Sequence, residues 1–86
     1  MEEAFLQPRY VNGAEIEIRF SGAWYAATVI RTHAYVIVYR LEEEGKRQAG
    51  FTRYAFGLFE KPCFITYPKG YEGQISRFSP NIRPRR

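Results

Sequence analysis

The stretch that decides the fold is Phe20-Ser-Gly-Ala-Trp-Tyr-Ala-Ala-Thr-Val-Ile30. It places a tight Ser-Gly turn directly before an aromatic pair and a run in which large residues alternate with small ones. Ser and Gly are typical turn residues, and the alternating run is typical of a β-strand. The stretch therefore predicts the rim of a small barrel with a groove lined by aromatic rings, which is a binding feature and not a catalytic one.

Two further strands are predicted on either side of this stretch. Residues 14–20 alternate small or charged residues with Ile16, Ile18 and Phe20, which is the pattern of a half-buried antiparallel strand. Residues 35–41 are β-branched or aromatic almost throughout, as strands prefer. With the strand at about residues 24–31, the short links predict a three-stranded meander.

The two faces of the second strand carry different aromatic residues. Tyr25, Ala27 and Val29 share one face, and Trp24 lies on the other. We expect Trp24 to pack against the end of the chain or against the segment that follows the meander.

The pattern is less regular after residue 41. Residues 42–48 indicate a charged loop. The spacing of one helix face is shown by Phe51, Tyr54, Ala55, Leu58 and Phe59. Gly50 and Gly57 disfavour a helix, so a short helical turn and an irregular aromatic flap stay equally open. Pro62 is expected to end this segment, and further strands are predicted at residues 63–67, 74–78 and 82–83.

One domain is expected in these 86 residues. Residues 1–13 are interpreted as an N-terminal extension, residues 14–85 as the domain, and residues 44–73 as an insertion in it. A chain this short buries only about 60–65% of its unfolded surface. The seven Phe, seven Tyr and one Trp are therefore expected to supply much of the core.

Cysteine content and hydropathy suggest where the protein works. The single Cys63 cannot form an internal disulfide, and neither an apolar N-terminal signal nor an apolar run of about 20 residues is present. We expect a soluble protein of a reducing compartment, the nucleus or alternatively the cytoplasm.

Catalytic and metal sites are hard to assemble from this sequence. His33 and Cys63 are the only residues of their types, and neither has a neighbour at a metal-ligand spacing. No nucleophile elbow and no Gly-rich phosphate loop occurs. We expect no enzyme activity, no catalytic residue, no metal and no cofactor.

An aromatic box is the leading candidate for a site. In a regular meander Phe20, Tyr25 and Tyr39 lie at the same end, where three ring faces could hold a methylated ammonium group at about 0.5–2 kcal/mol per ring. Glu42 and Glu43 follow at once and would form an acidic rim for a basic peptide. The alternative is that these rings only fill the core.

The charge distribution suggests a second hypothesis. Residues 1–43 hold four Arg and six Glu, a balance of −2, whereas residues 44–86 hold nine Lys and Arg and three Glu, a balance of +6. The basic half could bind nucleic acid, or it could be ordinary solvated surface. Candidate phosphate contacts are Arg53, Lys69, Arg77, Arg83, Arg85 and Arg86.

Four segments resemble the Agenet branch of the Tudor-like "Royal" superfamily. They are Glu15-Ile-Glu-Ile-Arg-Phe20, Gly22-Ala-Trp-Tyr-Ala-Ala-Thr-Val-Ile30, Tyr35-Val-Ile-Val-Tyr-Arg-Leu41 and Asn81-Ile-Arg-Pro-Arg85. The resemblance implies a mainly β fold, a small, strongly bent, five-stranded antiparallel Tudor-like (SH3-like) barrel. It also implies a chromatin module, often in tandem, that reads methylated lysine or arginine on histone tails.

The resemblance also assigns residues to the methylated-peptide cage. The usual cage positions correspond to Phe20, Tyr25 and Tyr39, and Glu42 stands where Tudor domains often have another aromatic residue. An acidic wall there would favour lower methylation states. The aromatic residues of the insertion, Tyr67 among them, have no counterpart in the family. They could cover the groove, supply a missing cage wall, or form a surface for a homodimer or another protein. Trp24, Tyr54 and Tyr71 are candidates for an additional wall.

Overall fold

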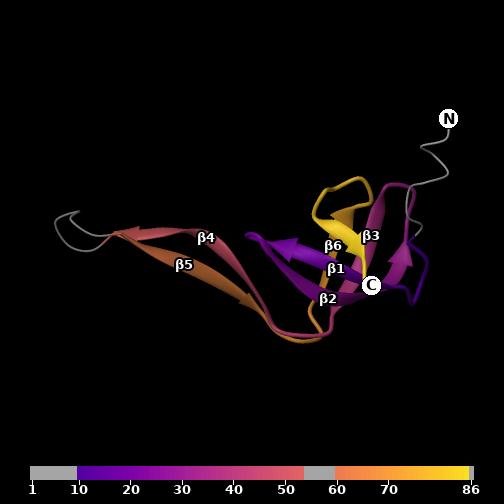
Figure 1. Cartoon of the computed structure of the whole chain (residues 1–86), viewed down its shortest axis with the longest axis horizontal. Helices are drawn as coiled ribbons and strands as arrows, with labels where there is room; N and C mark the ends of the chain where they lie inside the picture. Colours follow the sequence, from indigo (N-terminus) through magenta and orange to yellow (C-terminus); the bar gives the residue numbers. More distant parts are fainter. Residues whose placement is uncertain (1–9, 54–59, 86) are drawn as a thin grey trace.

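The described part of the chain, residues 10–53 and 60–85, contains β-strands and no helix in the computed structural model. Its strands are β1 (Glu15–Phe20), β2 (Ala23–Thr32), β3 (Val36–Leu41), β4 (Gly45–Arg53), β5 (Glu60–Tyr67), β6 (Glu72–Ser76) and β7 (Ile82–Pro84). Figure 1 shows a curved sheet from which β4 and β5 project as a long hairpin. The predicted mainly β class is confirmed.

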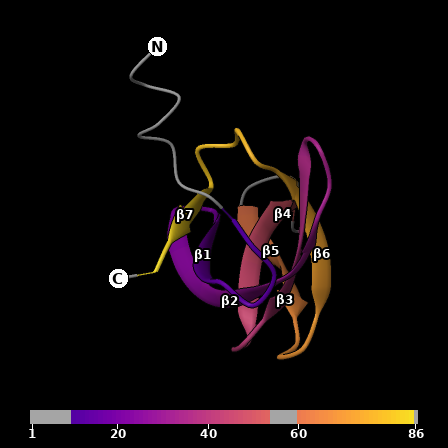
Figure 2. The same cartoon turned by 90° about the vertical axis from the view of Figure 1, so that its right-hand side faces the viewer.

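The sheet has five antiparallel strands in the order β6-β3-β2-β1-β7. The meander of β1, β2 and β3 is as predicted, while β6 and β7 return to its two sides. Figure 2 shows how strongly the sheet curves, with β7 and β6 at opposite edges. No described pairing joins these two edges, so the sheet is not closed into the barrel that the sequence predicted.

A two-residue turn connects β1 to β2. Phe20 pairs with Ala23, and both turn residues have positive φ, 49° at Ser21 and 87° at Gly22. Two successive positive φ values match the right-handed twist of the flanking strands, and Gly adopts them without steric cost. The turn predicted from Ser-Gly is therefore the one that sets the hairpin register.

The core lies on the concave side of the sheet, where residues alternate inward. Its buried cluster consists of Ile16, Ile18, Ala27, Val29, Ile37, Tyr39, Leu41 and Ile82. A register shift between Val29 and Arg31 leaves an extra residue in β2. Such a bulge bends a strand and increases its twist. The predicted faces of the first two strands are confirmed, since Ile16, Ile18 and Val29 are each only 1% exposed.

The region after β3 differs from the prediction. The sequence predicted a charged loop at residues 42–48 and then a short helical turn or an irregular aromatic flap. Residues 45–53 instead form strand β4, because they pair along their length with β5. Helix-like spacing is a local pattern, and cross-strand pairing overrides it here. The remaining residues of the predicted flap, 54–59, lie outside the described residues.

Pro62 does not end a segment, because it lies inside β5 opposite Phe51. Both strands of a two-stranded ribbon have a free edge, and edges are where sheets tolerate proline. Strand β6 also begins at Glu72, two residues earlier than predicted, because Arg40 and Tyr39 of β3 pair with Glu72 and Gly73.

The residues just before β1 pack onto the sheet. Tyr10 contacts the core cluster, and the Gly13 amide donates to the Val29 carbonyl at 2.7 Å. Part of the predicted extension is therefore joined to the sheet. Within the described residues, no helix reaches the length and apolarity of a membrane span.

Candidate aromatic binding site

Four partly buried rings form a continuous row where the hairpin meets the sheet. The Phe20 ring centroid lies 5.6 Å from that of Tyr25 and 5.3 Å from that of Tyr67, and Tyr67 lies 4.5 Å from Tyr71. Neighbouring rings are tilted by 35–44°. All four pack against the buried core, so we call Phe20, Tyr25, Tyr67 and Tyr71 the aromatic cluster.

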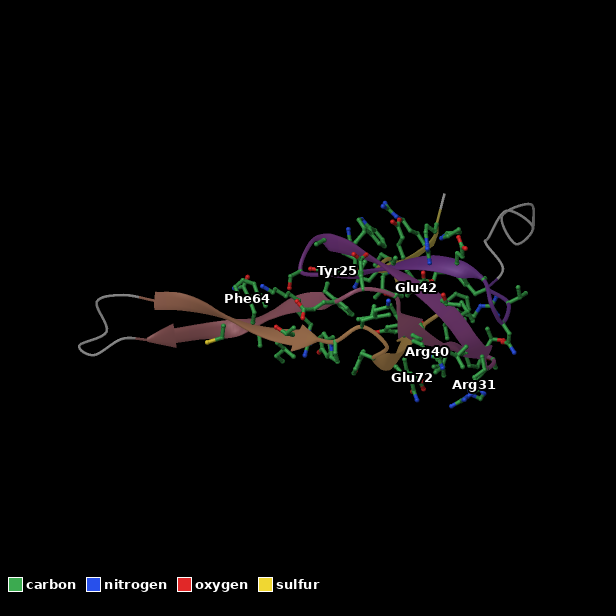
Figure 3. All side chains as sticks on the ribbon, turned by 90° about the horizontal axis from the view of Figure 1, so that it is seen from below. Tyr25, Arg31, Arg40, Glu42, Phe64 and Glu72 are labelled. Carbon is green, nitrogen blue, oxygen red and sulfur yellow. The ribbon has the colours of Figure 1, made fainter. Side chains whose placement is uncertain are left out.

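The hairpin base is joined to the β1–β2 turn by three contacts. A Cβ added to Gly45 would lie 3.3 Å from the Phe20 ring, so β4 begins directly against that ring. The Gln48 amide donates to Ser21 Oγ at 2.8 Å, and the Tyr25 hydroxyl donates to the Lys46 carbonyl at 3.4 Å. Figure 3 shows Tyr25 at this junction.

Tyr39 forms the buried base of the cluster. Its side chain is 4% exposed and covers Gly73 of β6, where an added Cβ would lie 2.6 Å from Tyr39 Oη and 3.0 Å from Tyr71 Cε2. Burial, with smaller effects of the Tyr71 and Tyr67 phenols, raises the pKa of Tyr39 to about 12, although Arg47 opposes the shift. The predicted trio is thus linked in one region, with Tyr39 as a floor and not an open wall.

A cation of the chain itself lies over the aromatic cluster. The Arg47 guanidinium carbon is 5.9 Å from the Tyr67 ring centroid. Cation–π attraction operates within about 6 Å of a ring centroid. The exposed face of Tyr67 is therefore accessible to a positively charged group.

Glu42 is not brought to the rings. Its carboxylate accepts hydrogen bonds from the Arg85 guanidinium at 2.7 and 3.4 Å and from the Thr28 hydroxyl. These bonds, first that from Arg85, lower the pKa of Glu42. Successive side chains of a strand point to opposite faces, and Ala27 is buried in the core. Thr28 therefore points outward, and Glu42 binds to the outer face of β2. Figure 3 shows Glu42 apart from Tyr25.

Glu43 is engaged nearby, since its Oε2 accepts a hydrogen bond from the Ala26 amide at 2.7 Å. The two carboxylates of the predicted acidic rim are therefore held by Arg85, which follows β7, and by the backbone of β2. The predicted preference for lower methylation states depended on the Glu42 carboxylate as a wall of the cage. Since that carboxylate is bound to Arg85 and Thr28, this basis for the preference is absent.

Trp24 also faces away from the cluster. The Arg83 guanidinium carbon lies 3.9 Å and that of Arg19 5.2 Å from its ring centroid, and Arg83 Nε donates to Glu17 at 2.7 Å. Packing against the end of the chain, one of the two predicted environments, is confirmed. Of the three residues predicted as an additional wall, Tyr71 lies in the aromatic cluster, Trp24 does not, and Tyr54 lies outside the described residues.

The predicted basic residues do not form one patch. Arg83 and Arg85 both form ion pairs with carboxylates. Lys69 precedes β6 and Arg77 follows it, so they lie toward opposite ends of that strand. The side chain of Arg53, and Arg86 as a whole, lie outside what the structure describes.

Tyr67 is the cluster residue that the sequence named only as one of the insertion's aromatic residues and did not single out for the cage. It ends β5 and is followed by Pro68, and its place becomes clear only when Gly45 is seen to pair with it. The alternation of residues 63–67 predicts the strand, but nothing local indicates that its last residue reaches Phe20. No protein family, no curated protein and no solved structure matches this chain.

Proposed function

We propose that this chain is a non-catalytic peptide-binding module of the Tudor/Agenet type that reads a methylated lysine or arginine in a basic peptide such as a histone tail. The observation that carries the proposal is the Arg47 guanidinium over Tyr67, within a cluster of partly exposed rings. A face that receives one cation from the chain can receive a cation from a peptide. The proposed ligand implies a nuclear location.

The proposed fold is a bent barrel that is open between β6 and β7. Three observations support it: β7 pairs with β1, the bulge bends β2, and the five strands curve in Figure 2. A meander whose last strand returns beside its first brings distant side chains to one rim, as the aromatic cluster requires.

In the proposed complex the methylated head group replaces Arg47 over Tyr67. Phe20, Tyr25 and Tyr71 flank the position, and Tyr39 closes it from below. Methylation makes an ammonium larger and easier to desolvate, which favours ring faces over water. A single small site of this kind binds with a Kd in the micromolar range, about −8 kcal/mol or less favourable.

The test is an NMR titration with three peptides of one sequence, carrying trimethyllysine, dimethylarginine or no modification. A methylated peptide should shift the amides around Tyr67 and Tyr71 and bind at least about tenfold more tightly than the unmodified one. Tyr67→Ala should remove this preference, whereas Tyr35→Ala, which removes an exposed ring elsewhere, should keep it. Equal binding of all three peptides would contradict the proposal.

A second variant tests the role of Arg47. Arg47→Ala removes the competing cation from the Tyr67 face, so a methylated peptide should bind a few-fold more tightly. Lys46→Ala is the matched control, because it removes one positive charge from the neighbouring position. Weaker binding by Arg47→Ala would show that Arg47 serves another purpose there.

A further inference from the structure

Two exposed rings lie together at the end of the sheet opposite the aromatic cluster. Tyr35 is 69% and Phe78 62% exposed, and their centroids are 6.2 Å apart. The Arg77 amide donates to the Tyr35 carbonyl at 3.0 Å, which ties the segment after β6 to the start of β3. The length of β3, about 17 Å for its five residue steps, separates this pair from the Tyr71 end.

An open pocket lies beside the ring pair. It has a volume of about 410 Å³, and its lining includes Tyr10, Arg77, Phe78 and Arg83. Burial raises the pKa of Tyr10, although the nearby Arg77 opposes the shift. The pocket thus combines an aromatic wall, a hydroxyl and two guanidinium groups.

The charges at this end are largely uncompensated. Arg77 lies 5.7 Å from the Phe78 ring centroid and has no carboxylate partner among the described residues, whereas Arg83 is paired with Glu17. Arg31 is exposed near the β2–β3 connection, and Figure 3 shows it at the opposite end from Tyr25. This end therefore attracts anions.

We propose that the Tyr35–Phe78 end binds single-stranded nucleic acid. Two accessible ring faces suit unpaired bases, which stack on aromatic side chains, and Arg77 lies close enough to Phe78 to contact the adjoining phosphate. A duplex keeps its bases stacked inside and cannot use the rings. An acidic peptide could pair with Arg77, but it would not stack on both the Tyr35 and the Phe78 ring. The site does not depend on the proposed peptide site, because the two lie at opposite ends of β3.

Fluorescence anisotropy with a labelled twelve-nucleotide oligo(dT) tests this site in the whole chain. Wild type should bind it more tightly than a twelve-base-pair duplex, with an affinity that falls as salt increases. Phe78→Ala should weaken binding about tenfold, since one stacked base is lost. Arg77→Ala should weaken binding and lower the slope of log affinity against log salt by about 0.7.

Arg40→Ala is the matched control, because Arg40 is an exposed arginine near the other end of β3 that pairs with Glu72 at 3.1 Å. It should change binding less than twofold. No binding by wild type at 50 mM salt, equal binding of the duplex, tighter binding of an acidic peptide, or equal losses in Arg77→Ala and Arg40→Ala would each overturn the proposal. Thermal melting of every variant checks folding, and Tyr35→Ala repeats the stacking test if Phe78→Ala melts early.

Discussion

The five-stranded sheet and the β4–β5 hairpin are built from similar residues, but they differ in what covers them. All nine buried hydrophobic residues of the described chain lie in β1, β2, β3 and β7. In the hairpin, Phe64 is 55% and Ile65 38% exposed. The sheet curves over its own side chains, whereas nothing described covers the projecting part of the hairpin (Figure 1). The stability of this protein therefore comes from the sheet, and the hairpin depends on its base.

The largest expected difference is in the stability lost when one side chain is truncated in the sheet and one in the hairpin. Ile18→Ala leaves a cavity in the core and should lower the free energy of unfolding by about 2–5 kcal/mol. Phe64→Ala removes a mostly exposed ring and should change it by no more than about 0.5 kcal/mol. Urea unfolding of both variants measures the difference. Similar losses would mean that the hairpin is covered in solution, for example by a second copy.

The next effect concerns the floor of the aromatic cluster, where sheet and hairpin meet. In Gly73→Ala the new Cβ would lie 2.6 Å from Tyr39 Oη, and this overpacking should cost about 1–3 kcal/mol. Adding Tyr39→Leu removes the clashing ring, so the two changes should be strongly non-additive in a double-mutant cycle. Additive losses would show that the strain at Gly73 has another source.

The smallest expected effect concerns the ion pair between Glu42 and Arg85, which holds the segment after β7 against β2. The pKa of Glu42 is lowered when folded, so its stabilisation is complete above its ordinary pKa of 4.5 and is lost as pH falls through the lower folded value. Glu42→Gln should lower stability at pH 7 by about 1 kcal/mol or less, given the exposure of the pair. The stability of the Glu42→Gln variant should also depend less on pH between 5 and 3 than that of the wild type. Glu44→Gln, at an exposed neighbouring position, should keep the wild-type profile in thermal melts.

Prediction from sequence worked best where a feature depends only on residues that are neighbours in the chain. The faces of β1 and β2 follow from alternation, and the Ser21-Gly22 turn from its two residues. It failed for residues 45–53, since neither a run of charged residues nor helix-like spacing gives information about a distant pairing strand. It also misplaced Glu42, because the partner that turns its carboxylate outward, Arg85, lies 43 positions away in the chain.

The sequence by itself therefore determined the β class, the first three strands and the inward faces of β1 and β2, because a two-residue period and a Ser-Gly turn act between neighbours. Only the tertiary structure decided which residues the two proposed binding surfaces bring together. Pairing of β7 with β1 and of β6 with β3 brings Arg85 to Glu42 and Tyr39 over Gly73, and the return of β5 brings Tyr67 to Phe20. These contacts join segments far apart in the chain, so they exist only once the whole sheet has formed.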